Sequence, residues 1–214
     1  GGWQVIFGME DGGWDRFLMV KSGSTKFCMG HTSGCWEPGP SITPGVWQHV
    51  VSIYDNGAMR FYLNGVEYST STNEGNHSSN GTFTIGANQN GGGNRYKGLI
   101  DEVAVWDKAL SASEITALYN SGKALNASSN TGNYNSADNL VGYWKMDEGS
   151  GTSISDSSGN SKTATLSNMT NDDWVAGIEN IDKSNFNITT PSGHTTETGT
   201  ASTFNVALLK SPTL

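Results

Sequence analysis

The stretch Gly98–Gly122 most constrains what this chain can fold into, because it specifies a strand and a helix in direct succession. Its first half carries apolar residues on both faces of a period-two pattern. One face holds Leu99, Val103 and Val105, and the opposite face holds Ile100, Ala104 and Trp106. This pattern is typical of a strand that is covered from both sides, so we expect a central strand here.

The second half of the stretch predicts one short, capped helix. Ser111 and Glu114 have the spacing of a capping box, in which each side chain bonds to the backbone N–H of the other residue. Three apolar residues, Ile115, Leu118 and Tyr119, then share one helical face. We expect the helix to end near residue 122, because glycine suits the left-handed residue that often ends a helix.

Upstream, alternation and two turn signals predict antiparallel hairpins. Residues 47–54, 59–63 and 66–68 alternate between two faces. Asn56–Gly57 and Asn64–Gly65 separate these segments, and both residue types tolerate the positive φ that tight hairpins need. Further strands are predicted at 3–8, 16–21, 26–29 and 82–86, with loops at 31–44 and 69–81. With 28 glycines in 214 residues, the chain fits an all-β, antiparallel sandwich with many turns.

Two sequence blocks carry a family resemblance. Gly-x-Ile-Asp-Glu-Val-x-x-Trp-x-x-Ala-Leu-Ser-x-x-Glu-Ile begins at Gly98, and Trp47–Asp55 followed by Met59–Val66 forms a second block upstream. In this order and spacing, the blocks resemble laminin-G-like, concanavalin A-like jelly-roll domains. With the strands around them they cover residues 3–122. The resemblance implies a jelly-roll β-sandwich with one short helix, and it implies little about function, because one fold hosts many activities.

After Gly122 the organisation changes. Residues 123–138 are mostly Ser, Asn, Ala and Gly, which is typical of a linker or a long crossover. Leu140–Gly151, followed by the turn Asp156–Asn160, resembles the first strand and hairpin of the same family. Residues 176–214 predict two strands, Phe186–Thr190 and Thr203–Leu208, around a Gly/Thr-rich turn region. This last part resembles the opening of a small β-rich repeat of secreted bacterial surface proteins.

Residues 139–175 allow two interpretations. In one, a second sandwich begins at Leu140 and breaks off. In the other, the segment folds back and supplies a strand that the sandwich of residues 1–122 lacks. We favour the second, because about 40 residues are too few for a domain and a strand at Val141–Met146 would cover the edge beside Ile100–Trp106. The chain then starts within a domain, and we expect it to be part of a larger multidomain protein.

Charge and hydropathy exclude two classes of partner. The net charge is −8, whereas nucleic-acid binding calls for a basic stripe. The same charge disfavours adhesion to anionic lipid. No apolar run approaches the roughly 18 residues that a membrane helix needs. We therefore expect neither nucleic-acid binding nor membrane insertion.

Asp101 is the candidate metal ligand. By alternation it shares a face with Leu99 and Val103, where a carboxylate must be paired, neutral or metal-bound. The family resemblance implies calcium as the cofactor, since some jelly rolls of this kind bind it through acids and loop carbonyls. Calcium needs 6–8 oxygen ligands. The alternative is a carboxylate that accepts backbone N–H bonds where the strand begins.

No pair of carboxylates has the spacing of a glycoside hydrolase. Glycanases of this architecture place two acids on one strand face, two or four residues apart. In the alternating pattern Glu102 points away from Asp101, and no serine lies in a nucleophile elbow. We therefore expect no catalytic residue and no enzyme, and a glucanase-type hydrolase ranks last.

Trp14 and Trp36 are candidate ligand contacts, because both stand beside Gly-rich turns and an indole face can stack on a sugar. Alternatively, each covers the edge of the core. Asn88, Asn90 and Asn94 belong to an Asn/Gly loop that supplies amides to a glycan or is a plain connection. The tryptophans that sit in strand patterns, and that we assign to the core, are Trp3, Trp47, Trp106 and Trp144.

Cys28 and Cys35 flank a turn-like segment. A disulfide across a short hairpin and two unpaired thiols on adjacent strands both fit their spacing, which does not decide between them.

Two main hypotheses for function fit these patterns. The first is a non-catalytic recognition or adhesion module of an extracellular, cell-surface or virion-surface protein. Its ligand would be a carbohydrate or another extracellular protein, bound with calcium assistance. The second is a structural spacer or surface decoration domain without a small ligand.

Overall fold

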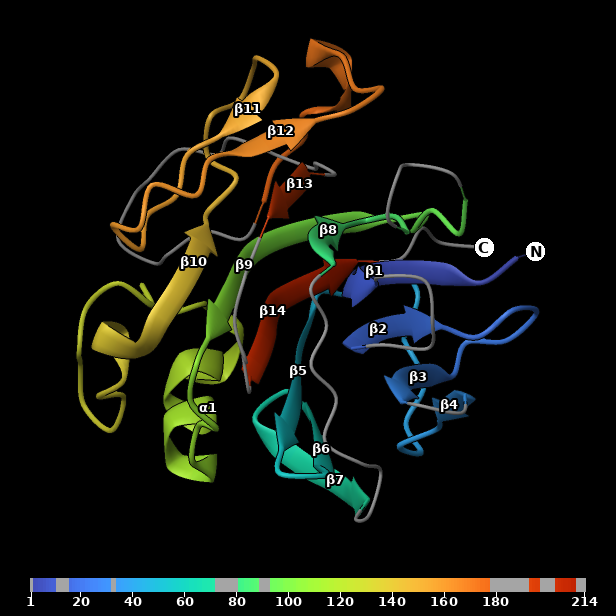
Figure 1. The fold of residues 1–214 in the computed structure, drawn as a ribbon, viewed down its shortest axis with the longest axis vertical. Coiled ribbons are helices and arrows are strands. Elements are labelled where there is room, and N and C mark those ends of the chain that lie inside the picture. The colour runs from blue at the N-terminus through green and yellow to red at the C-terminus, as the bar shows by residue number, and fades with distance from the viewer. Residues whose placement is uncertain are drawn as a thin grey trace.

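The computed structural model describes residues 2–10, 16–31, 34–71, 81–88, 93–177, 193–196 and 203–210. Within these residues the chain forms two sheets and one α-helix (Figure 1). The strands are β1 (Gln4–Glu10), β2 (Arg16–Val20), β3 (Phe27–His31), β4 (Gly34–Trp36), β5 (Gln48–Asp55), β6 (Ala58–Leu63), β7 (Val66–Ser71), β8 (Thr82–Ile85), β9 (Leu99–Trp106), β10 (Leu140–Trp144), β11 (Ser153–Ile154), β12 (Ala164–Leu166), β13 (Gly193–Thr196) and β14 (Thr203–Lys210). The helix α1 spans Ala112–Tyr119, and 3₁₀ turns cover Asn120–Gly122, Ala137–Asn139 and Asn171–Asp173.

The two sheets are antiparallel throughout their described pairings. The first has eight strands in the order β11-β12-β13-β8-β1-β2-β3-β4, and the second has six strands in the order β10-β9-β14-β5-β6-β7. Strands that neighbour each other in a sheet are often far apart in the sequence, as Figure 1 shows for β14 between β9 and β5. The predicted all-β jelly-roll sandwich with one short helix is confirmed.

Apolar side chains of both sheets meet in one central core. Its buried members include Phe7, Leu18, Phe27, Val50, Phe61, Phe83, Val103 and Trp144. A second cluster fills the space between the six-stranded sheet and α1, and it includes Val51, Ile53, Trp106, Ile115 and Leu118. Burying one such side chain contributes about 1.5–3 kcal/mol, so these two layers supply most of the driving force for folding.

β9 lies between β10 and β14 and is covered on both faces, as predicted. The central core includes its Ile100, Val103 and Val105, and the cluster under α1 includes its Ala104 and Trp106. The alternating pattern predicted that Ile100 lies on the opposite face of the strand from Val103 and Val105, and this prediction is wrong. The physical reason is Glu102, which has a φ of +55°. A left-handed residue inside a strand changes the phase of the side chains that follow it.

α1 begins with the predicted capping box. The Glu114 N–H donates to Ser111 Oγ (3.3 Å), and the Ser111 N–H donates to Glu114 Oε2 (2.9 Å). The helix ends slightly earlier than expected, because Asn120 is the left-handed residue that caps it. Gly122 also has a positive φ but lies in the 3₁₀ turn that follows.

Residues 140–177, here called the closing segment, pack into the same sandwich. β10 pairs with β9 so that Tyr143 lies opposite Ala104. Trp144 of this segment stacks on Phe83 of the eight-stranded sheet, with ring centroids 5.6 Å apart. The Asp156 carboxylate accepts the N–H of Tyr143 (3.0 Å) and thereby ties the chain after β11 to β10. The fold-back interpretation requires this pairing, and the domain boundaries themselves stay a prediction.

Two strands from the range 176–214 belong to the two sheets. β14 pairs with both β9 and β5, and β13 pairs with both β12 and β8. We expected a separate partial repeat here; its predicted strand Thr203–Leu208 is confirmed as β14. In the structure the two strands are integral to the sandwich, where they satisfy backbone groups of strands that would otherwise lack a neighbour. The predicted strand Phe186–Thr190 lies outside the described residues.

The sequence patterns did not predict the short strands β4 and β11. They have three and two residues, which is too short for a period-two pattern to stand out. Each is defined by its partner, β3 for β4 and β12 for β11.

Gly8 permits the close approach of β1 to β2. It pairs with Phe17, and a Cβ added to Gly8 would lie 2.7 Å from the Phe17 Cβ. We expect Gly8→Ala to lower the free energy of unfolding by about 1–3 kcal/mol through overpacking, measured by urea unfolding. Gly93→Ala is the matched control, because a Cβ there meets no atom within 4 Å. Equal effects of the two substitutions would contradict this packing argument.

Glu114 stabilises the start of α1 through its charge as well as its cap. Its Oε1 accepts a hydrogen bond from Ser136 and lies 3.6 Å from Lys108 Nζ. Burial alone would raise the pKa of Glu114, but hydrogen bonds from Ser136 and Ser111 hold this pKa below its usual value. A carboxyl whose pKa is lower in the folded state stabilises the fold above its unfolded pKa, and this contribution is lost as the pH falls through the folded pKa.

We therefore expect Glu114→Gln to lower the free energy of unfolding at pH 7 by about 1 kcal/mol. The deficit should shrink as the pH falls below 4.5, because the lowered pKa places protonation of the wild-type carboxyl in this range. Urea unfolding of both proteins across this pH range measures it. A deficit that is the same at every pH would contradict the electrostatic part of the argument.

Candidate functional site

The start of β1, with Trp3 just before it, and the segment 93–97 form one surface, here called the Trp3 surface. The Val5 N–H donates to the Asn94 carbonyl (2.6 Å), and the Lys97 N–H donates to Gln4 Oε1 (3.0 Å). Val5 and Arg95 also form a parallel bridge. These contacts fix the segment that follows the Asn/Gly loop against the first strand.

Asn94 is held at the centre of this surface. It has a φ of +53°, a region that Asn tolerates better than most residues. A Cβ on Gly2 would lie 3.8 Å from Asn94 Oδ1, so the side chain lies beside the backbone that leads into Trp3. The Asn88 N–H donates to the Gly93 carbonyl (3.4 Å), which closes the base of the loop. Both amide side chains are half-buried, and Asn90 lies outside the described residues.

Trp3 contributes an aromatic ring to the same surface. Its side chain is half-buried, and its covered part packs against Val5, Phe17, Met19 and Cys28, here called the outer cluster. We expected Trp3 in the core between the sheets, and this prediction is wrong. The residue lies just before β1, where the sheet ends, so the strand pattern was extended one position too far. Trp47 likewise precedes its strand and is half-buried rather than buried.

The outer cluster gives this surface a rigid base. It lies on the opposite side of the first sheet from the central core, because alternate residues of β2 and β3 belong to the two clusters. Its four residues are at most 5% exposed, so they form no open platform for a ligand. The solvent-accessible part of this surface is formed by the side chains of Trp3, Asn94 and Arg95.

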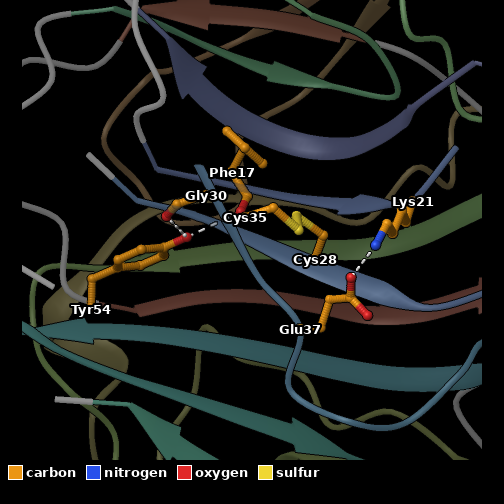
Figure 2. Close-up of a disulfide and its surroundings, with 7 residues drawn as sticks. All are labelled: Phe17, Lys21, Cys28, Gly30, Cys35, Glu37 and Tyr54. Carbon is orange, nitrogen blue, oxygen red and sulfur yellow. Dashed lines mark hydrogen bonds and ion pairs between the residues drawn. A yellow bond between two sulfur atoms is a disulfide. The ribbon is translucent and has the colours of Figure 1, made fainter. Parts of the chain in front are cut away.

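A disulfide fastens the outer cluster at its far edge. Figure 2 shows the bond between Cys28 of β3 and Cys35 of β4, whose Cα atoms are 5.5 Å apart. The sequence left bridged and unpaired thiols open, and the structure contains the bridge. The ion pair between Lys21 and Glu37 lies beside it and joins the end of β2 to the chain after β4.

Tyr54 holds the two sheets together beneath this region. Its hydroxyl lies 3.0 Å from the Phe17 carbonyl oxygen and 3.1 Å from that of Gly30, as Figure 2 shows. Burial raises the pKa of Tyr54 well above its usual value. The phenol therefore stays neutral and acts as a structural donor.

Two of the remaining candidate residues, Trp36 and Asp101, lie among the described residues. Trp36 is half-buried and packs against the central core from β4. This placement favours the alternative in which it covers the core edge, and its role as a ligand contact stays a prediction. Trp14 lies outside the described residues.

Asp101 is buried in β9, and its carboxylate lies against Gly177, where an added Cβ would come within 2.2 Å of Oδ2. In the part of the chain that the structure describes, no group of three or more His, Cys, Asp or Glu residues could hold a metal ion. One carboxylate does not make the 6–8 oxygens of a calcium site. Among the described residues Asp101 thus belongs to no such acid cluster, and calcium binding stays a prediction.

The Trp3 surface combines an aromatic ring with hydrogen-bonding and charged groups. It presents an indole ring, an amide and the exposed cationic side chains of Arg95 and Lys97. An indole ring stacks on apolar faces, and amide and guanidinium groups hydrogen-bond hydroxyl or carboxyl groups. This combination suits recognition of a polar, ring-shaped ligand.

Loss of the disulfide should loosen the edge that supports this surface. The bond closes a loop with a sequence separation of 7, for which the chain-entropy estimate is about 2–3 kcal/mol. We expect reduction to lower the free energy of unfolding by up to this amount, measured by urea unfolding with and without a phosphine reductant. The Cys28→Ala/Cys35→Ala double variant should unfold like the reduced protein and ignore the reductant. Identical unfolding of oxidised and fully reduced protein would contradict the prediction.

Comparisons with known proteins agree with the fold. Curated proteins give no match. Among solved structures, a Bacteroides ovatus protein provisionally described as carbohydrate-binding is 19% identical with a TM-score of 0.58. That match covers 76% of this chain and 47% of the other, so the chain spans about half the length of that protein. An S-layer domain-containing protein from Clostridium thermocellum is 25% identical with a TM-score of 0.30, over 55% of this chain and 63% of the other.

The Laminin_G_3 family, described as the Concanavalin A-like lectin/glucanases superfamily, matches residues 1–116. This is more than half of the 214 residues. The chain therefore belongs to the concanavalin A-like lectin/glucanases superfamily.

Proposed function

We propose that this chain is a non-catalytic recognition module that binds a carbohydrate at the surface formed by Trp3, Asn94 and Arg95. The observation that carries the proposal is the partly exposed Trp3 ring, two residues before Val5, whose N–H donates to the Asn94 carbonyl, in a member of a lectin and glucanase superfamily. The solved relative from B. ovatus, described as carbohydrate-binding, is in line with this proposal.

The chemistry of a sugar fits this surface. One face of a pyranose ring presents C–H groups that pack on an indole, and its hydroxyls exchange hydrogen bonds with amides and guanidinium groups. The backbone contacts at Val5 and Lys97 hold these groups in place before a ligand arrives. Such preorganisation reduces the entropy lost on binding.

Recognition without catalysis is proposed because the buried carboxyl groups have structural partners. Glu114 caps α1 and accepts a hydrogen bond from Ser136. Glu102 accepts a hydrogen bond from Tyr143, and Asp101 packs against Gly177. A glycoside hydrolase needs two such groups facing one glycosidic bond.

The proposed setting is extracellular or on a cell or virion surface, as part of a larger multidomain chain with a glycan or an extracellular protein as partner. The disulfide supports this setting, because such bonds persist in oxidising compartments. No described helix combines the length and the apolar character that crossing a lipid bilayer requires.

The test is glycan-array binding of the whole chain, followed by titration of the strongest glycan. We expect Trp3→Ala to weaken binding by about tenfold or more, corresponding to at least about 1.4 kcal/mol. Asn94→Ala should weaken it through the lost amide. Tyr68→Ala is the matched control, because Tyr68 is an exposed aromatic residue on β7 of the other sheet.

Two outcomes would count against the proposal. Wild-type protein that binds no glycan would favour the structural spacer. Binding that survives Trp3→Ala in a variant with an unchanged unfolding midpoint would place the site elsewhere, with Trp14 and Trp36 as the next candidates. Calcium assistance stays a prediction, and a chelator in the titration tests it together with Asp101→Asn.

A further inference from the structure

Arg95 and Lys97 place two positive charges on the segment that forms the Trp3 surface. The residue between them, Tyr96, packs against the central core, and its N–H donates to the Gly86 carbonyl (2.8 Å). Because side chains alternate along an extended chain, this anchor directs both cationic side chains away from the core, and both are exposed. The two charges are therefore held close to each other at the surface.

The Trp3 ring and Arg95 lie on the same outer face of the eight-stranded sheet. Trp3 packs with Val5 in the outer cluster, and Val5 forms the parallel bridge with Arg95. Residues that pair in a bridge share a face of the sheet. Trp3 precedes Val5 by two positions, which is about 7 Å along an extended chain. A sugar ring that stacks on Trp3 therefore has its substituents within reach of the Arg95 guanidinium.

This surface is positively charged, although the chain as a whole is strongly negative. Residues 2–9 and 86–100 contain two basic residues and no acidic one, whereas the whole chain contains 12 basic and 20 acidic residues. Directly after the neighbouring strand β2, the charge of Lys21 is balanced by an ion pair with Glu37. At physiological salt, exposed charges more than about 8 Å away are largely screened, so the local charges decide what a ligand meets.

We propose that the Trp3 surface selects acidic carbohydrates, whose sugar rings carry a carboxylate, over neutral ones. This inference rests on the proposed function and names the ligand class of the same site. The indole stacks on the C–H face of the ring, the Arg95 guanidinium donates two parallel N–H bonds to the carboxylate, and the Lys97 ammonium supplies a second positive charge. Such a carboxyl group is ionised at pH 7, so a neutral sugar lacks both charge contacts.

The experiment compares each acidic ligand with its own methyl ester, which keeps the sugar ring but removes the charge. Calorimetric titration measures binding of the whole chain to oligomers of galacturonate, glucuronate and mannuronate, and to their methyl esters. We expect at least one acid form to bind about fivefold or more tightly than its ester at low salt, because each exposed charge contact adds a modest gain. Salt at about 1 M should remove most of this preference.

Substitutions of Lys97 test whether the preference comes from this surface. The bond from Lys97 to Gln4 uses the backbone N–H, so a new side chain leaves it in place. Lys97→Gln should reduce the preference by about twofold to threefold and leave binding of the ester unchanged. Lys97→Glu should make the ester the tighter ligand, because the new carboxylate repels that of the sugar.

Lys123→Gln is the matched control. Lys123 is an exposed cation in the crossover that joins α1 to β10, on the side of the six-stranded sheet. Its substitution changes the net charge of the chain by the same amount as Lys97→Gln, and it should keep the full preference for the acid form.

Three results would overturn the inference. A protein that binds the methyl esters or neutral glycans as tightly as the acids keeps its recognition function but lacks the proposed selectivity. A preference that persists in Lys97→Glu would come from another place, and one that falls equally in Lys123→Gln would come from net charge alone. Absence of binding to every glycan, those of the array included, would contradict the proposed function itself, and the selectivity with it.

Discussion

The fold depends on covering both faces of β9. A strand whose residues are almost all buried needs an apolar layer on each side, and a single sheet-to-sheet interface supplies only one. The eight-stranded sheet covers one face, while α1 and the crossover cover the other. Trp106 shows the consequence, because it is fully buried and its ring nitrogen still needs an acceptor, which Tyr134 of the crossover provides. The crossover is therefore part of the structure rather than a passive linker.

The central strand and its helix could be predicted from residues 98–122 because the determining interactions are local. A capping box and a short helical face are specified by neighbours three or four residues apart. The hairpins at Asn56–Gly57 and Asn64–Gly65 were predictable for the same reason, and both asparagines adopt positive φ. The places of β13 and β14 were not predictable, since each is set by partners far away in the sequence.

Only part of the candidate surface could be predicted from the sequence, for a related reason. Asn94 was noticed because an Asn/Gly loop is visible in composition. Trp3 was assigned to the core because a pattern in the sequence does not show where a sheet ends. What joins the two residues is the hydrogen bond from the Val5 N–H to the Asn94 carbonyl, a contact between segments that are remote in sequence. The left-handed backbone of Glu102 was not predicted for a different reason, because such a residue within a strand leaves no trace in hydropathy.

The proposed binding surface and the contact between Glu102 and Tyr143 lie in separate parts of the sandwich. Trp3 stands before β1, whereas Glu102 and Tyr143 join β9 and β10 in the other sheet. The closing segment reaches the eight-stranded sheet through β11 and β12, with β13 and β8 between them and β1. Trp144 of this segment stacks on Phe83 of β8, whereas the outer cluster lies under Trp3. The order of strands thus separates the closing segment from the proposed recognition surface.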